Sequence, residues 1–246
     1  MIFAAIIVVA GLVLLAVGCS SLERTLLFHP THLPETNGLA PWKDESGTSI
    51  GFSRAVAAPK TVWLLLHGNG GQAAGRGYAL SRFSPGDAVY IMEYPGFGLR
   101  AGSPSRTSFN HAAEEAYRLL RRAYPNTPVC VAGESLGSGP ASFLATLDRP
   151  PEKVVLVVPF ARLSSVARDH YPALLVTALL RSDWDNIAAL SRYKGPVDIF
   201  AARGDAIIPV AHAITLAGAV PQAKLTILDG GHNEWSNNER VRIVNP

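Results

Sequence analysis

The sequence predicts an α/β protein with a mostly parallel, doubly wound sheet and helices on both faces. Short, continuously apolar runs recur along the chain, as expected for strands that are buried on both sides. Amphipathic helical patterns separate several of these runs, and helices between parallel strands cover such a sheet. Ligands bind these folds at the loops that follow the carboxyl ends of the strands, so a functional site is expected there.

Composition predicts one large globular domain. The chain has 246 residues, of which 48% are hydrophobic and 17% are charged. The formal net charge is +3, and the basic residues are scattered except for small groups such as Arg118, Arg121 and Arg122. Their helical spacing predicts a solvated helix face, so we do not expect nucleic acid as a partner.

The chain has two cysteines, Cys19 and Cys130. Cys130 lies in an apolar run and is expected to be a small buried hydrophobic residue. Two cysteines of this kind make neither a disulfide framework nor a metal site, and we expect no cofactor and no metal.

The first 18 residues, MIFAAIIVVAGLVLLAVG, contain no charged side chain. As a helix they would extend about 27 Å, close to the thickness of a bilayer core. Residues 1–19 are therefore interpreted as a signal peptide or a membrane anchor, and residues 25–246 as the folded domain. A buried core helix is disfavoured because the chain turns polar at once, with Ser20, Ser21 and Glu23.

The stretch LAVGCSS around Cys19 resembles a bacterial lipoprotein signal. That resemblance implies lipidation of Cys19, export, and a location facing the periplasm or the exterior. The alternative is an uncleaved N-terminal transmembrane anchor. Both interpretations predict attachment to a membrane through the N-terminus.

The first half of the domain contains three predicted strands and one helix. Residues 50–53 alternate apolar and polar side chains, which is typical of a half-exposed strand. Residues 61–66, TVWLLL, and residues 88–92, AVYIM, predict buried strands. Residues 108–124 have apolar side chains at helical spacing, and Pro125 predicts the end of that helix.

The second half continues the alternation. A helix rich in small residues is predicted at 136–147, and another at 209–219, where Pro209 occupies a first helical position. The remaining apolar runs predict strands at residues 129–132, 154–158, 197–201 and 225–228.

Glycine-rich loops and polar side chains, including a serine, aspartates and histidines, follow four of the predicted strands. The second apolar run is followed by HGNGG at 67–71, and the later ones by GESLG, RGD and DGGH. In G-x-S-x-G, a strand turns so tightly into a helix that Gly133 and Gly137 must flank Ser135, because a Cβ at either position would clash. An ordinary Gly/Ser turn is the alternative, but later strand ends supply an aspartate and a histidine in the order expected for an activated serine.

These motifs resemble the α/β-hydrolase fold over about residues 26–235, and within it the Bem46-type serine hydrolases. The resemblance implies a short lid at about residues 160–190, which contains the apolar stretch YPALLVTALL and either forms an acyl-binding wall or packs on the domain. The chain departs from such relatives at residues 95–98, PGFG, where they have RGYG. It also ends shortly after its last motif, with only residues 237–246 where relatives have a full helix. The further matching segments are EYPGFGLRAGSPS, PFARLSSVARDHYP, RGDAIIP and GGHNE.

Three side chains are predicted to form a catalytic triad. Ser135 is the expected nucleophile and His232 the general base. Asp205 is expected to orient His232, with Asp229 as the competing acid three residues before that histidine. His67 is the competing histidine and is interpreted as structural.

The oxyanion hole is expected from the backbone N–H groups of Asn69 and Leu136. Phosphate binding at HGNGG is disfavoured because no Walker lysine follows. His170 is expected at the lid surface or in packing, and Trp184 and Trp235 are candidates to line the pocket.

The predicted function is hydrolysis of a carboxylic ester or thioester through an acyl-enzyme on Ser135. Acyl transfer or peptidase chemistry on the same triad is one alternative, and a non-catalytic membrane-tethered binding protein is another. An apolar lid and membrane attachment favour a small-molecule or lipid-like acyl ester as substrate.

Overall fold

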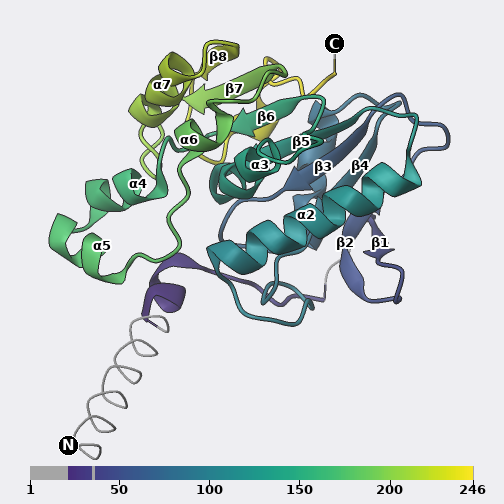
Figure 1. Cartoon of the computed structure of the whole chain (residues 1–246), viewed down its shortest axis with the longest axis horizontal. Helices are drawn as coiled ribbons and strands as arrows, with labels where there is room; N and C mark the ends of the chain where they lie inside the picture. Colours follow the sequence, from purple (N-terminus) through teal and green to yellow (C-terminus); the bar gives the residue numbers. More distant parts are fainter. Residues whose placement is uncertain (1–21, 35–36, 246) are drawn as a thin grey trace, which may run out of the picture.

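The computed structural model describes residues 22–34 and 37–245, which form one eight-stranded sheet covered on both faces (Figure 1). The strand order is β1-β2-β4-β3-β5-β6-β7-β8. The first three of these strands pair antiparallel, and all pairs from β4 onward are parallel. The strands are β1 Ala40–Lys43, β2 Ser49–Arg54, β3 Val62–Leu66, β4 Ala88–Met92, β5 Val129–Glu134, β6 Val154–Val157, β7 Val197–Ala202 and β8 Ala223–Leu228.

Helices cover the sheet because its strands are apolar on both faces. Alternate residues of the central strand β3 enter two different clusters of buried side chains, with Leu64 and Leu66 in one and Trp63 and Leu65 in the other. The first cluster lies under α2 and α3, which Figure 1 shows lying across the sheet. The helices are η1 Ala73–Arg82, α2 Arg106–Ala123, η2 Ser135–Gly137, α3 Ser138–Leu144, α4 Leu163–His170, α5 Ala173–Leu179, α6 Asn186–Leu190, α7 Val210–Ala219 and η3 Trp235–Asn237, where η denotes a 3₁₀ helix.

The predicted fold class is confirmed, with differences at several elements. The edge strand β1 was not predicted, and neither was the 3₁₀ helix η1. The helix predicted at 136–147 is a 3₁₀ turn, η2, followed by the shorter α3. Pro209 precedes α7 as its N-cap and is not the first helical residue, so that detail of the prediction is wrong.

The parallel pairing brings the predicted motifs to one edge of the sheet. Because β3, β5, β6, β7 and β8 run in the same direction, their carboxyl ends share an edge. In Figure 1 the arrowheads of β6 and β7 point toward α4 and α5, which lie beyond that edge. The loops that follow β3, β5, β7 and β8 therefore meet there.

The predicted lid at about residues 160–190 contains three short helices. The last of them, α6, packs on the domain, where the Asn186 side chain donates hydrogen bonds to Ser138 Oγ and to the Phe160 carbonyl. The first two, α4 and α5, project from the domain beside residues 22–27, which are helical (Figure 1). The insertion therefore packs on the domain through α6 and through Leu163 and Val166 of α4, while α5 buries only Val176.

The chain segment after His232 is anchored without a full helix. After η3, the Ile243 N–H donates to the Arg82 carbonyl at 2.8 Å. The Arg82 guanidinium donates to the Asn238 carbonyl at 2.8 Å, and Val241 and Ile243 are buried. These contacts fasten residues 238–243 to the end of η1.

The predicted signal peptide or anchor at residues 1–19, with the lipidation site Cys19, lies outside the described residues. Within residues 22–34 and 37–245, no helix combines the length and the apolar character needed to cross a bilayer.

Candidate active site

Ser135 occupies a strained turn at the carboxyl end of β5. Its φ is +51°, in the left-handed region that non-glycine residues rarely adopt. A Cβ on Gly137 would lie 2.0 Å from the Leu66 carbonyl oxygen, and one on Gly133 would lie 2.5 Å from the Gly137 oxygen. Both glycines are therefore required for this turn, which fits the predicted geometry of the G-x-S-x-G motif.

Ser135, His232 and Asp205 form a continuous hydrogen-bonded chain. His232 Nε2 lies 3.0 Å from Ser135 Oγ, and His232 Nδ1 lies 2.7 Å from Asp205 Oδ2. The other carboxylate oxygen of Asp205 accepts from the backbone N–H groups of Ile207 and Ile208 at 2.9 and 2.8 Å. Because an ionised carboxylate only accepts, Nδ1 donates to it and Nε2 is left to accept from the serine hydroxyl.

Asp229, the competing acid, points elsewhere. Its side chain is 91% exposed and lies 3.6 Å from the Arg203 guanidinium. Asp205, in contrast, is buried and contacts the imidazole directly. The structure therefore brings together Ser135, His232 and Asp205, as the order of the strand ends predicts.

The glycine-rich loop after β3 lies directly beside the serine. A Cβ placed on Gly68 would be 3.4 Å from the Ser135 Cβ. The Asn69 side chain is held by the N-terminal segment. Its amide N–H donates to the Leu27 carbonyl at 2.6 Å, and its oxygen accepts from the His29 N–H at 2.9 Å. Leu136 follows Ser135 in η2. The two residues of the predicted oxyanion hole thus belong to segments that adjoin the serine, and their donor role stays a prediction.

A buried ion pair supports this loop, and the sequence reasoning missed it. Glu134 Oε2 accepts from the Gly68 N–H at 3.1 Å and lies 3.6 Å from Arg76 Nη1. Its other oxygen accepts from the Tyr78 hydroxyl and from Trp235 Nε1. The Arg76 guanidinium in turn donates to the carbonyls of the loop, including the Gly68 oxygen at 3.1 Å.

Burial alone would raise the pKa of Glu134. The Arg76 guanidinium and the donors from Gly68, Tyr78 and Trp235 outweigh burial and hold that pKa below its ordinary value. The carboxylate is therefore ionised, and it can accept four contacts at once. A charged residue directly before the serine, at the end of an apolar strand, was the available signal in the sequence. Nothing in the sequence pointed to Arg76.

His67 takes part in a separate buried cluster. Its Nε2 lies 3.2 Å from Glu93 Oε1 and its Nδ1 lies 2.8 Å from the Gly68 oxygen. The Tyr94 hydroxyl donates to the His67 carbonyl at 2.8 Å. Both ring nitrogens are thus engaged in shaping the loop, in line with the structural interpretation of this histidine.

The remaining candidates take supporting positions. His170 is exposed at the end of α4, and its Nε2 lies 2.8 Å from the Ile207 carbonyl oxygen. Trp184 is buried in the domain and donates to Asn110 Oδ1 at 2.9 Å. Trp235 is also buried, and its Nε1 donates to Glu134 Oε1 at 3.1 Å. The two tryptophans therefore pack in the interior.

Cys130 is buried, as predicted. Burial, reinforced by the charge of Glu152, raises the pKa of its thiol to about 12, so the thiol stays protonated. In the part of the chain that the structure describes, no three His, Cys, Asp or Glu side chains are grouped to hold a metal ion.

Comparison with known sequences finds distant relatives, while no family model matches the chain. An uncharacterized protein of Mycobacterium tuberculosis is 28% identical over 230 residues, covering 87% of this chain and 82% of that protein. Lysophosphatidylserine lipase ABHD12 of Gallus gallus is 29% identical over 154 residues, covering 59% of this chain. The match spans only 40% of the length of that lipase.

Comparison with solved structures shows the fold. An esterase of Pyrococcus furiosus superposes with a TM-score of 0.62 at 16% identity, covering 85% of this chain and 95% of the esterase. A hydrolase of Pseudomonas aeruginosa superposes with a TM-score of 0.61 at 18% identity, covering 82% of this chain and 94% of the hydrolase. The protein therefore has the α/β-hydrolase fold that the motifs imply.

Proposed function

We propose that the protein is a serine hydrolase that cleaves carboxylic esters through an acyl-enzyme on Ser135. The observation that carries this proposal is the chain of hydrogen bonds from Ser135 through His232 to Asp205, at the carboxyl edge of an α/β-hydrolase sheet. The names of the relatives, a lipase and esterases, support the same reaction class.

Acylation follows from the geometry of these three residues. Ser135 Oγ attacks the ester carbonyl carbon while its proton passes to His232 Nε2, and Asp205 stabilises the imidazolium that forms. The carbonyl oxygen becomes an oxyanion, to which the N–H groups of Asn69 and Leu136 are proposed to donate. Loss of one such donor typically costs about 3 kcal/mol of transition-state stabilisation. When the C–O bond breaks, His232 returns the proton to the departing alcohol.

Deacylation reverses the roles of the same groups. A water molecule gives a proton to His232 Nε2 and attacks the acyl carbon of the ester on Ser135. The second tetrahedral intermediate collapses, Ser135 recovers the proton, and a carboxylic acid leaves. No cofactor or metal takes part in these steps.

We propose a lipid-like acyl ester as the substrate class. One relative is named as a lysophosphatidylserine lipase, and the predicted lid exposes the apolar side chains of Tyr171, Leu174 and Leu175. Cleavage of a thioester, acyl transfer and peptidase chemistry would use the same triad, and analysis of the products separates them. The hydrogen-bonded Ser135–His232–Asp205 geometry argues against a purely binding role.

We also propose that residues 1–19 attach the protein to a membrane, through a lipid on Cys19 or as an uncleaved anchor, in line with a Bem46-type hydrolase with a lipoprotein signal. The support is the uncharged apolar sequence of that segment. Fractionation of cells that express the wild type or Cys19→Ala tests the proposal. Release of the variant alone supports lipidation, retention of both supports an anchor, and a soluble wild type contradicts both.

Hydrolysis of p-nitrophenyl butyrate and labelling by a fluorophosphonate test the reaction. We expect the wild-type full chain to show both activities and Ser135→Ala to show neither. Ser142→Ala is the matched control, because that buried hydroxyl of α3 has no hydrogen-bond partner within the described residues. Equal labelling of the wild type and Ser135→Ala would contradict the proposal.

A further inference from the structure

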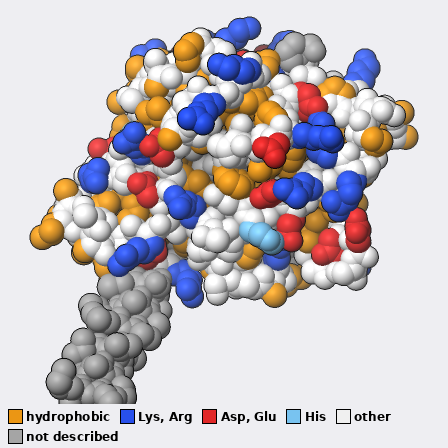
Figure 2. Space-filling view, viewed as in Figure 1, with side chains coloured by type: hydrophobic (Ala, Val, Ile, Leu, Met, Phe, Trp, Pro, Cys, Tyr) orange, Lys and Arg blue, Asp and Glu red, His pale blue; other side chains and the backbone are white. Residues whose placement is uncertain are grey.

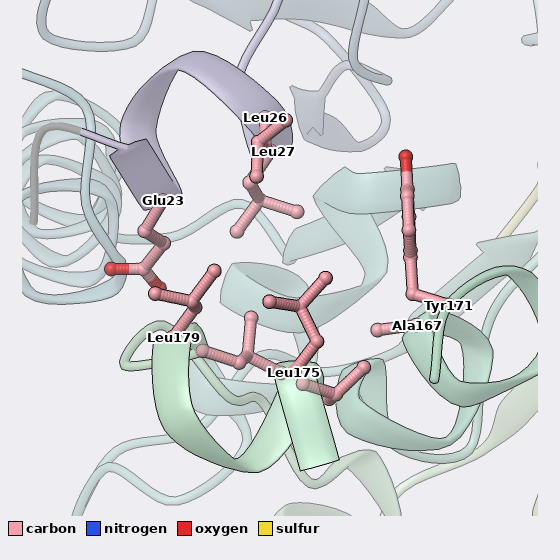
Figure 3. Close-up of a pocket in the computed structure, with 9 residues that line it drawn as sticks. Glu23, Leu26, Leu27, Ala167, Tyr171, Leu175 and Leu179 are labelled. Atoms are coloured by element: carbon pink, nitrogen blue, oxygen red, sulfur yellow. The ribbon is translucent and has the colours of Figure 1, made fainter. Parts of the chain in front are cut away.

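An apolar cavity lies between residues 22–27 and the two projecting helices α4 and α5 (Figure 3). The cavity has a volume of about 80 Å³ and is open to solvent. Figure 3 shows side chains from residues 22–27 and from α5 facing each other across this space. The lining residues are Glu23, Leu26, Leu27, Ala167, Tyr171, Leu175, Val176, Leu179 and Leu180.

The one acidic side chain in the lining is already satisfied. Glu23 is buried, and its Oε1 accepts from the backbone N–H groups of Arg181 and Ser182 at 2.7 and 2.6 Å. These bonds tie residues 22–27 to the chain segment that follows α5 and close one end of the cavity. What lines the rest is hydrocarbon, apart from the Tyr171 hydroxyl, so the cavity suits an apolar ligand.

Each wall of the cavity is fastened to a different loop of the active site. On one wall, the Leu27 carbonyl accepts from the side-chain amide of Asn69, the proposed oxyanion residue. On the other, His170 at the end of α4 contacts the carbonyl oxygen of Ile207, whose N–H binds Asp205. The two walls of the cavity are therefore hydrogen-bonded to the two loops that flank the catalytic serine.

The mouth of the cavity is apolar as well. Leu26, Tyr171 and Leu175 are each about half exposed although they line it. Figure 2 shows hydrophobic side chains among polar and charged ones at the left edge, where α5 lies. These exposed apolar side chains give a hydrocarbon chain an apolar approach to the cavity.

We propose that this cavity is the acyl-chain subsite of the enzyme, holding the tail of a single-chain ester whose carbonyl reaches Ser135. The inference rests on the proposed ester hydrolysis and deepens it, because it assigns the N-terminal segment to substrate recognition. Each methylene that leaves water for such a cavity contributes favourably to binding. Residues 22–27 and α5 then select the acyl chain, while the triad performs the chemistry.

A chain-length series on the full chain in membranes tests the subsite, with active enzyme counted by fluorophosphonate titration. For p-nitrophenyl esters longer than butyrate, kcat/KM of the wild type is expected to rise roughly two- to fourfold per methylene until the cavity is filled. Leu175→Trp fills the cavity, so the ratio of kcat/KM for decanoate to that for butyrate should fall at least about tenfold. Ala167→Leu narrows the cavity from α4, on the same wall, and should act in the same direction.

Leu174→Trp is the matched control. Leu174 is adjacent on α5, is 84% exposed and does not line the cavity, so the chain-length ratio should not change. The contrary result is that Leu175→Trp and Ala167→Leu hydrolyse butyrate and keep the wild-type ratio of kcat/KM for decanoate to that for butyrate. That result would contradict the acyl-chain subsite and leave the proposed ester hydrolysis supported.

A binding measurement keeps the subsite testable without hydrolysis. A fluorescent fatty acid should bind the full-chain Ser135→Ala variant and be displaced by laurate. A double variant that carries both Ser135→Ala and Leu175→Trp should bind the same fatty acid about tenfold more weakly. Equal binding by the two variants overturns the subsite. If no variant hydrolyses any ester but the fatty acid binds as expected, the proposed function fails and the cavity remains an acyl-binding site.

Discussion

The two sides of the active site are built differently. On the nucleophile side, Ser135 has a strained conformation in a turn that has no room for a Cβ at Gly133 or Gly137, and the buried Glu134–Arg76 pair supports the neighbouring loop. On the opposite side, α5 and residues 22–27 leave a cavity and expose leucines, with Leu174 84% exposed. The turn that carries the serine is thus fixed by packing, while the proposed acyl-chain subsite lies among less tightly packed side chains.

The largest effect should come from the acid of the triad. Asp205→Asn keeps the shape of the side chain but allows its amide to favour the wrong tautomer of His232, so kcat should fall about 10³–10⁴-fold. Steady-state hydrolysis of p-nitrophenyl butyrate measures this change. Asp229→Asn is the control and should stay within twofold of the wild type, because that side chain is exposed and points away. Equal losses in the two variants would contradict the assignment of Asp205.

Replacing a glycine beside Ser135 by alanine should destabilise the protein far more than replacing a glycine distant from the site. A Cβ at Gly137 would lie 2.0 Å from the Leu66 carbonyl oxygen, so Gly137→Ala should lower the free energy of unfolding by more than about 3 kcal/mol or prevent folding. Gly218 in α7 has no atom within 4 Å of an added Cβ, so Gly218→Ala should not destabilise the protein. Denaturant titration compares the two, and similar stability would refute the tight turn.

The ion pair behind the loop should act on turnover more than on substrate affinity. Glu134→Gln removes the charge that anchors Arg76 and the Gly68 N–H, so kcat should fall about tenfold with little change in KM. Glu45→Gln, at an exposed ion pair with Arg122, should change neither. If Glu134→Gln raises KM alone, the pair does not position the oxyanion loop.

The lowered pKa of Glu134 also predicts that the stability lost in Glu134→Gln depends on pH. Because the pKa of Glu134 is lowered in the folded protein, its carboxylate stabilises the fold above the pKa of an unfolded glutamate, about 4.3, and this contribution disappears as the pH falls through the folded value. The free energy of unfolding of the wild type should exceed that of Glu134→Gln at pH 7, and the difference should shrink below about pH 4. A difference that is constant with pH would show that folding does not lower the pKa of Glu134.

The smallest effect should come from the exposed face of α5. Leu174→Ser removes a side chain that is mostly in solvent, so the free energy of unfolding should change by less than about 0.5 kcal/mol. Denaturant titration against the wild type checks this value. A loss of several kcal/mol would mean that α5 is packed as tightly as the nucleophile side.

Much of the fold could be predicted because buried parallel strands leave a plain signal. The runs at β3, β4 and β6 are continuously apolar, β5 is apolar up to Gly133, and β7 is apolar except for Asp198, so their positions follow largely from hydropathy. The edge strand β1 was missed because only its third residue is buried, which leaves almost no pattern. The 3₁₀ helix η1 was missed because its glycines and short apolar stretch match neither a helix nor a strand.

The site was predictable where residues follow strand ends, and hidden where they meet only in the folded chain. The positions of Ser135, Asp205 and His232 follow from the strand order, since parallel strands end at one edge. Arg76 reaches Glu134 across 58 positions of sequence, from a 3₁₀ helix with no motif. The wall formed by residues 22–27 is likewise a product of tertiary packing, because its partners in α5 lie about 150 residues away.

The central claim is that Ser135, His232 and Asp205 work as one unit that makes Ser135 nucleophilic. The most direct measurement is peptide mass mapping of the full chain after reaction with a fluorophosphonate, for the wild type and for His232→Ala. The account predicts one adduct per chain, on the peptide that contains Ser135, and a rate of adduct formation at least 10³-fold lower without the histidine. An adduct on another residue, or the same rate in His232→Ala, would contradict it.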